Sequence, residues 1–238
     1  MTDLRGSGAP HTFRSVRECE AIAFDFGGTL DGPGEPWVER FAVAYRDAGV
    51  DVAPGDLHEA AGYGTRQAYH TAAVASFSLR ETIAFHVSCQ FAHLQIENPL
   101  AADRIGARFL ARTEAALAES RVVLTRLAAR RHLAVISNFY GNVERILADA
   151  GFAPLLATVL DSTVVGISKP DPRIFTLAAE RLGFAPHEVL YVGDSFEHDI
   201  VPAHTAGLRT AWLTGRSAVA NTRCDLRIVR LSDLEQLI

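Results

Sequence analysis

Short apolar runs recur along the chain, and most end at a polar residue. The first run, at residues 21–24, leads into Asp25 and the pair Gly27 and Gly28. Such runs are typical of buried parallel strands, and the stretches between the later runs have the apolar spacing of helices. The later strands are predicted near residues 133–137, 158–160, 189–192, 209–213 and 226–229, and the helices near 142–150, 172–182 and 199–206. This alternation predicts an α/β fold with a doubly wound, Rossmann-like parallel sheet.

A different pattern occupies the region between the first and second predicted strands. From Pro36 onward, apolar side chains recur at helical spacing. Helices are predicted over residues 37–45, 79–96 and 99–118, the last opened by a proline that suits a first turn. We therefore expect residues 35–118 to form an all-helical insertion. The core is then made of residues 21–34 and 119–238, and residues 1–20 are predicted to be a flexible leader.

Polar groups follow several of the predicted strands. Ser137 and Asn138 end the second run, Asp194 follows the run at 189–192, and a further acid comes at Asp199. Ligands of open α/β sheets bind at the carboxyl ends of the strands. The sequence therefore predicts a polar site at that edge, to which Asp25 also belongs.

Lys169 is the only lysine of the chain, which otherwise uses arginine for its permanent positive charges. An ammonium is a compact point charge with three donors, whereas a guanidinium is a planar fork. A lysine therefore suits a crowded site that holds carboxylates and a phosphate. The alternative is chance in an arginine-biased composition, and the strand-end acids favour the functional interpretation.

The order of these residues resembles that of the haloacid dehalogenase superfamily of phosphohydrolases and related enzymes, over residues 21 to about 213. The resemblance implies that Asp25 attacks phosphorus and becomes an aspartyl-phosphate. It also implies that Ser137 supplies the hydroxyl of the second motif and Lys169 the lysine of the third, while Asp194 and Asp199 are the metal-binding acids of the fourth. The helical insertion then corresponds to the family's cap domain.

The chemistry of phosphoryl transfer agrees with this assignment. A carboxylate repels a phosphate dianion unless positive charges neutralise both partners, and magnesium binds through one or two carboxylates plus phosphate oxygen. We expect Asp25, Asp194 and the carbonyl of Gly27 to hold Mg²⁺, with Asp199 bound directly or through water. Lys169 would offset the repulsion among the acids.

Phosphate oxygens need hydrogen-bond donors of their own. Ser137 and backbone N–H groups around Gly28 and Asn138 are predicted to hold them as an oxyanion hole does, with Thr29 in the same loop. Ser137 and Asn138 also suit a helix N-cap, and both roles can hold at once. The substrate is expected to be a small phosphorylated molecule.

One residue departs from the family's pattern. In phosphatase branches the residue two positions after the nucleophile is an aspartate that protonates the leaving alcohol, and here it is Gly27. General acid–base catalysis contributes about 10²–10⁴-fold, so alkyl phosphates should react slowly unless another group substitutes. The candidates are Asp31, Glu197, His198 and a histidine of the insertion.

The departure leaves three alternatives open. Phosphonate-cleaving members need a cap lysine, and the insertion has none. The favoured function is a magnesium-dependent phosphatase. The others are a weakened or inactive phosphate-binding protein and a dehalogenase-type hydrolase, although the presence of Asp194 argues for phosphate.

The insertion is expected to choose the substrate by closing over the strand ends. The stretch 63–66 is predicted to be turn-like, and its Arg66 could clamp a second anionic group. The other polar candidates, for which packing or surface roles are the simpler interpretation, are His70, Arg80, His86 and His93.

The composition limits the kinds of partner that are expected. The formal net charge is −5, and the sequence shows no basic face that would indicate binding to nucleic acid. No apolar stretch of about 18 residues predicts a membrane span, and the N-terminus has no signal-peptide core, so a cytoplasmic protein is expected. Cys19, Cys89 and Cys224 are widely spaced and are interpreted as reduced packing thiols. The oligomeric state is not predicted.

Overall fold

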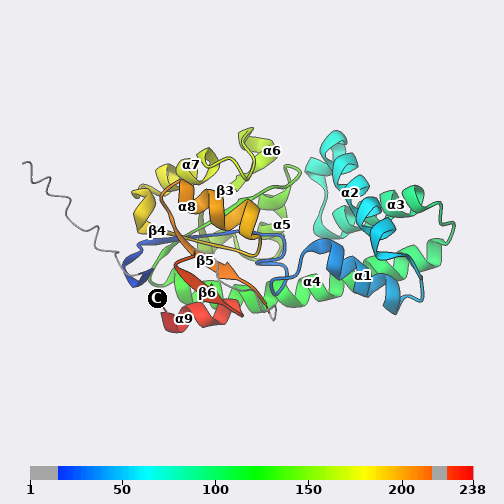
Figure 1. Ribbon diagram of the computed structural model, residues 1–238, viewed down its shortest axis with the longest axis horizontal. Coiled ribbons are helices and arrows are strands. Elements are labelled where there is room, and N and C mark those ends of the chain that lie inside the picture. Colours follow the sequence, from blue (N-terminus) through cyan, green and yellow to red (C-terminus); the bar gives the residue numbers. More distant parts are fainter. Residues whose placement is uncertain (1–15, 216–223, 238) are drawn as a thin grey trace, which may run out of the picture.

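A six-stranded sheet forms the centre of the larger lobe, with strand order β3-β2-β1-β4-β5-β6 and parallel pairing throughout (Figure 1). The computed structural model describes residues 16–215 and 224–237. The strands are β1 (Ala21–Phe24), β2 (His132–Ser137), β3 (Leu156–Asp161), β4 (Val189–Gly193), β5 (Arg209–Leu213) and β6 (Leu226–Ile228). The predicted doubly wound α/β fold is confirmed.

Each strand sends alternate side chains to opposite faces of the sheet, and helices bury both faces. Ile22 and Phe24 of β1 belong to one apolar cluster, and Ala21 and Ala23 belong to the other. The first cluster includes residues of α4 (Pro99–Ala128), α5 (Val143–Asp149) and α9 (Leu234–Leu237); the second includes residues of α7 (Arg173–Leu182) and α8 (Val201–Thr205). Because both faces are covered, the carboxyl ends of the strands are left to carry a site.

The smaller lobe, here called the helical unit, consists of α1 (Trp37–Asp47), α2 (Pro54–His70), α3 (Leu79–Leu94) and the first half of α4. It has its own apolar core. Helix α3 begins at a capping box in which Ser78 and Glu81 exchange hydrogen bonds. Helix α4 is preceded by its N-cap residue Asn98, whose side chain accepts from the N–H of Ala101.

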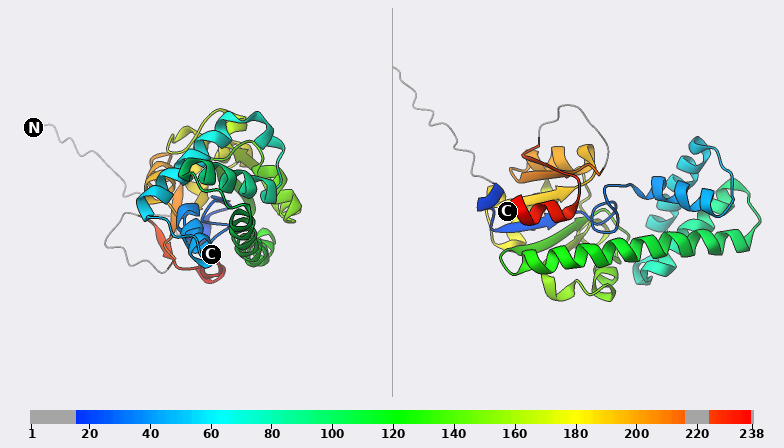
Figure 2. Two further views of the ribbon diagram at one scale, coloured as in Figure 1. Left: turned by 90° about the vertical axis from the view of Figure 1, so that its right-hand side faces the viewer. Right: turned by 90° about the horizontal axis from the view of Figure 1, so that it is seen from below.

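Helix α4 joins the two lobes as one continuous element of 30 residues (Figure 2, right). It contributes Phe109 to the core of the helical unit and Leu124 to the core beneath the sheet. The domain boundary predicted between residues 118 and 119 therefore lies inside a helix and not at the end of one.

The predicted turn at residues 63–66 is wrong, because this stretch lies in the middle of α2. Gly64 is buried against α3, where an added Cβ would lie 3.1 Å from Nδ1 of His86. The glycine thus permits close packing of two helices and does not mark a turn.

Two segments of the core differ from the structure that the sequence predicts. Most of the predicted leader lies outside the described residues, but Val16–Glu18 form a 3-10 turn and Cys19 is buried in the core. After β4 the chain forms a π-helical turn, Phe196–Ile200, before α8. Within the part of the chain that the structure describes, no helix combines the length and apolarity needed to cross a bilayer.

Candidate active site

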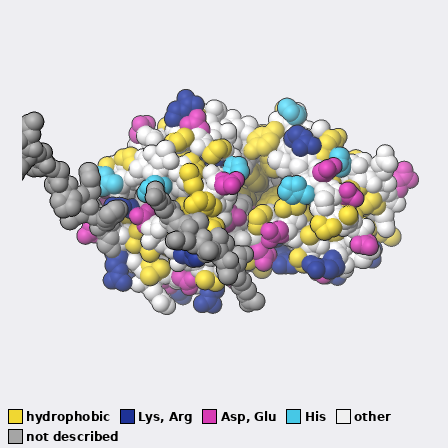
Figure 3. Space-filling view, viewed as in Figure 1, with side chains coloured by type: hydrophobic (Ala, Val, Ile, Leu, Met, Phe, Trp, Pro, Cys, Tyr) yellow, Lys and Arg dark blue, Asp and Glu magenta, His cyan; other side chains and the backbone are white. Residues whose placement is uncertain are grey.

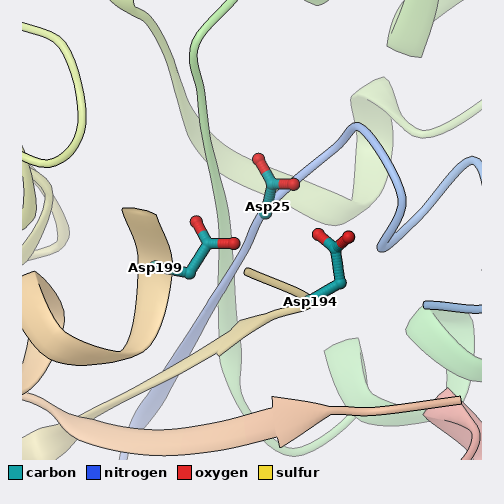
Figure 4. A group of neighbouring side chains, drawn as sticks. All are labelled: Asp25, Asp194 and Asp199. Carbon is teal, nitrogen blue, oxygen red and sulfur yellow. The ribbon is translucent and has the colours of Figure 1, made fainter. Parts of the chain in front are cut away.

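Three carboxylates meet where β1 and β4 end (Figure 4). Asp25 directly follows β1, Asp194 directly follows β4, and Asp199 lies in the π-helical turn. Strands β1 and β4 are neighbours in parallel register, with Phe24 opposite Val192, so the first two acids reach the same edge. One oxygen of each group lies within 4.8 Å of one oxygen of each other group.

Two glycines make this close approach possible. Gly28 has φ +89°, and an added Cβ would lie 2.4 Å from Oδ2 of Asp194. At Gly193 an added Cβ would lie 2.5 Å from Cβ of Asp199. Side chains at either position would push the acids apart, so the loop after β1 and the end of β4 need glycine there.

Lys169 joins two of the acids from one side. Its Nζ donates to Oδ1 of Asp25 and to Oδ1 of Asp199, both at 2.6 Å, and to the hydroxyl of Tyr191 at 3.1 Å. Its three donors are therefore engaged, and the side chain is buried. Asn138 fixes the lysine's backbone, since its side-chain amide donates to the Lys169 carbonyl and accepts from the Lys169 N–H, each at 2.8 Å.

Charge in this site is only partly balanced. Burial raises the pKa of Asp25 to about 7 against the opposing pull of Lys169, and it raises the pKa of Asp194 to about 8 with help from the charges of Asp25 and Asp199. Burial by itself would lower the pKa of Lys169, but Asp199 and Asp25 outweigh it and raise that pKa. The lysine is thus protonated. Asp25 and Asp194 keep their protons to a higher pH than ordinary carboxylates, because Lys169 does not fully offset the effect of burial on their pKa values.

The predicted phosphate-binding groups have partners of their own. Ser137 is buried at the end of β2 and lines the cavity described below. Thr29 is fully buried and donates to Oδ1 of Asp194 at 3.3 Å. The N–H of Gly28 donates to Oδ1 of Asp31 at 2.7 Å, so this predicted oxyanion donor is already engaged.

A cavity of about 430 Å³ lies over the acids, between the two lobes, where the surface is hollowed in Figure 3. From the core it is lined by the acids, Lys169, Ser137 and Asn138, and from the helical unit by residues of α1, α2 and α3. Arg66, predicted to clamp an anion here, is exposed and is not among the described lining residues. His70, Arg80 and His93 are likewise exposed and outside that lining.

Sequence reasoning did not single out several residues that the fold brings to the cavity. Trp37 from the start of α1 and His58 from α2 both line it, as does the predicted candidate His86. The apolar spacing predicts that Trp37 lies in a helix but does not predict that it lines the cavity. No sequence signal distinguishes a helix residue that faces the sheet edge from one that faces its own helical unit.

The core offers three candidates to replace the acid that Gly27 lacks: Asp31, Glu197 and His198. Of these three, only His198 lines the cavity. Its N–H donates to Oγ of Ser195 at 3.2 Å, and its Nδ1 lies 3.3 Å from the same oxygen. Asp31 is fully buried and accepts from Gly28, Trp37 and Arg40. Glu197 is exposed outside the described lining.

A comparison with models of protein families shows which family the chain belongs to. The model of the haloacid dehalogenase-like hydrolases matches residues 19–207. The chain therefore belongs to this family of hydrolases, as the order of its motifs predicts.

Individual relatives cover less of the chain. A phosphoserine phosphatase of Thermus thermophilus is 42% identical over 82 residues, which are 34% of this chain and 33% of that protein. The match thus spans about a third of that relative's length. Among solved structures, a dehalogenase with an intermediate complex has a TM-score of 0.64 at 19% identity, over 93% of this chain and 97% of that one. The HAD hydrolase YfnB from Bacillus subtilis, solved with magnesium bound, has a TM-score of 0.57 at 19% identity, over 92% and 98%. These structural similarities establish the fold.

Proposed function

We propose that this chain is a magnesium-dependent phosphatase that hydrolyses a small phosphorylated metabolite through an aspartyl-phosphate on Asp25. The observation that carries the proposal is the position of Lys169, whose Nζ bonds both Asp25 and Asp199 at 2.6 Å on the floor of a cavity. The partial similarity to a phosphoserine phosphatase supports the same reaction class.

The acids fit a hard divalent cation. Their ligand atoms are all carboxylate oxygens and lie within 4.8 Å of one another, which is the donor set that Mg²⁺ prefers. When all three carboxylates are ionised, they and one ammonium sum to a charge of −2, so a phosphate dianion would be repelled without further positive charge. We assign Asp25 and Asp194 as ligands, with the Gly27 carbonyl, and Asp199 as direct or water-mediated. Magnesium bound there would supply charge neutralisation.

The protein's own groups would then perform the transfer. Lys169 holds one carboxylate oxygen of Asp25, which orients the group for attack on phosphorus. The Ser137 hydroxyl, on the same cavity wall, would donate to an equatorial phosphate oxygen. Asn138 acts through Lys169, because it fixes the backbone from which the ammonium extends.

Gly27 limits which esters can react. It offers no proton to the leaving oxygen, and water that attacks the aspartyl-phosphate finds no carboxylate at this position. We therefore expect esters with acidic leaving groups to react faster than sugar phosphates.

The test is turnover of phosphate esters by the parent protein and by Asp25→Asn, with magnesium and with excess chelator. Removal of the nucleophile should abolish turnover while the thermal melting curve still shows a folded protein. Chelator should also abolish turnover, and added magnesium should restore it. Full activity in the Asn variant or in chelator would contradict the mechanism.

Measurements of phosphate binding and of halide release distinguish the other two possibilities. Phosphate binding without turnover of any ester would indicate a phosphate-binding protein. Halide release from a 2-haloacid, with no need for metal, would indicate a dehalogenase-type hydrolase.

A further inference from the structure

Part of the wall that the helical unit and the loop after β2 contribute to the cavity is aromatic. Trp37 and Phe41 come from α1, and Phe139 and Tyr140 from the loop after β2. The rings pack on one another, with centroids 6.0 Å apart between Trp37 and Phe139 and 4.7 Å apart between Phe139 and Tyr140. A wall of this kind favours a flat apolar group over a hydrated one.

His86 extends this wall without adding a charge. Its ring centroid lies 5.3 Å from that of Trp37 and 5.4 Å from that of Tyr140. The side chain is only 2% exposed, and burial lowers its pKa to about 4. The imidazole is therefore neutral at physiological pH and behaves as one more ring of the wall.

A second anionic group of a substrate would find little to hold it. Among the described lining residues, Lys169 is the only side chain with a permanent positive charge, and Asp25 and Asp199 already engage it. His58 and His198 also line the cavity, and neither is a permanent cation. The cavity therefore disfavours a leaving group with a carboxylate or a second phosphate.

The space beside the nucleophile is bounded by the same wall. An added Cβ at Gly27 would meet only Nε1 of Trp37, at 3.9 Å, within 4 Å. The room that an acid side chain would fill thus faces an indole ring. A leaving group there gains ring contacts but no proton.

From these observations we infer that the substrate is an aryl phosphate, the phosphate monoester of a phenol without a second charged group. The inference rests on the proposed phosphatase function. An oxygen of Asp25 forms a bond to phosphorus, and the bond from phosphorus to the aryl oxygen breaks with its electron pair leaving on the phenolate. Water then attacks the phosphorus of the aspartyl-phosphate, which releases inorganic phosphate and restores the carboxylate. The phenolate takes its proton from solvent.

The first experiment measures binding alone, by calorimetry of the parent protein with magnesium and phosphonates that cannot be hydrolysed. Benzylphosphonate should bind at least tenfold more tightly than 3-phosphonopropionate, which carries a second anion. Equal or tighter binding of 3-phosphonopropionate would overturn the inference.

The second experiment compares kcat/KM for phenyl phosphate with that for a fluorinated alkyl phosphate whose alcohol is as acidic as phenol. Ring recognition predicts at least a tenfold preference for the phenyl ester. Equal rates would overturn the aryl inference and leave the phosphatase function intact, because leaving-group acidity alone would then explain both. Tight benzylphosphonate binding without turnover of any ester would instead contradict the phosphatase function and support the ligand class.

A pair of variants tests the wall directly. Trp37→Phe and Trp37→Leu both lose the hydrogen bond from Nε1 to Asp31, but only the second loses the ring. The ratio of phenyl to alkyl kcat/KM should be kept in Trp37→Phe and should fall at least fivefold in Trp37→Leu. Tyr63→Leu, which removes a ring of α2 outside the described lining, should keep the ratio. An unchanged ratio in Trp37→Leu would overturn the inference; if that variant does not fold, the parent's ratio still decides.

Discussion

At the scale of single residues, the two adjacent glycines of the loop after β1 have different reasons to be glycine. Gly28 has φ +89° and touches Asp194, so any side chain there is excluded. Gly27 has no such constraint, because its φ lies outside the left-handed region and an added Cβ meets only Trp37, at 3.9 Å. The backbone therefore requires glycine at position 28 but leaves room for a side chain at position 27.

This difference predicts the result of Gly27→Asp. A carboxyl group at this position should raise the rate on alkyl phosphates by about 10²–10⁴-fold, the usual contribution of general acid–base catalysis. Steady-state kinetics on a sugar phosphate checks it, and Gly27→Ala, which adds only the Cβ, should keep the parent's rate. Gly28→Ala should lower the rate in the same assay, because its Cβ displaces Asp194. An equal gain in the Ala and Asp variants at position 27 would contradict the acid–base explanation.

Lys169→Arg should lower kcat by about 10²-fold or more although the charge is kept. The ammonium places three donors on Asp25, Asp199 and Tyr191 within a buried space, and a planar guanidinium cannot reproduce that geometry. Kinetics with saturating magnesium measures the loss, and thermal melting controls for folding. Parental activity in this variant would mean that the solitary lysine is an accident of composition.

At the scale of elements, Asp31 connects the loop after β1 to α1 and α4. Its carboxylate accepts from the N–H of Gly28 at 2.7 Å, from Nε1 of Trp37 at 2.6 Å and from Arg40 at 2.9 Å. Arg40 also donates to Thr113 of α4. The loop after β1 and the helical unit are thus connected through one buried ion pair, although neither Asp31 nor Arg40 is among the described residues that line the cavity.

Arg40→Leu should destabilise the protein by about 3–5 kcal/mol, because it leaves a buried carboxylate without its cation. Urea unfolding followed by circular dichroism measures the change. The matched control is Arg108→Leu, which breaks the exposed pair between α4 and Asp47 and should cost less than about 1 kcal/mol. Similar losses in the two variants would show that the buried pair contributes no more than a surface one.

The strands could be predicted because a buried parallel strand is a run of consecutive apolar residues. Several of the candidate site residues could be predicted because they directly follow such runs. The run at residues 21–24 and the acid behind it require no knowledge of the rest of the chain. The prediction of a turn at residues 63–66 was wrong because Gly64 permits close packing against α3, which is distant in sequence. Trp37 was placed in a helix correctly, but its position over Gly27 depends on how the helical unit sits on the core.

At the scale of the whole molecule, the two lobes contribute different kinds of side chain to the cavity. The sheet brings the charged groups to one edge, and the helical unit and the loop after β2 add aromatic rings to the cavity wall. One helix, α4, runs through both apolar cores, so the position of the wall is coupled to the packing of the sheet. Lys169 pairs with only two of the three clustered acids, so their ionisation without a metal ion costs stability that the rest of the fold must offset.

That cost predicts how magnesium stabilisation depends on pH. The pKa values of Asp25 and Asp194 rise from an ordinary 3.8 to about 7 and about 8. Because they are raised in the folded state, these groups favour folding most at low pH, and that stability is lost as pH rises through about 7 to 8. Magnesium requires the ionised carboxylates, so its binding releases protons below this range and offsets the repulsion above it.

Magnesium should therefore raise the melting temperature far more at about pH 8.5 than at about pH 5.5. At a concentration about 100 times the dissociation constant, the shift at the higher pH should be about 5–10 °C. Differential scanning calorimetry at both pH values measures it. Asp194→Asn removes one ligand and part of the repulsion, so this variant should melt higher than the parent in chelator at the higher pH and should gain little from magnesium. A magnesium shift of the same size at both pH values would show that these carboxylates are already ionised in the metal-free protein, and that Lys169 alone balances their charge.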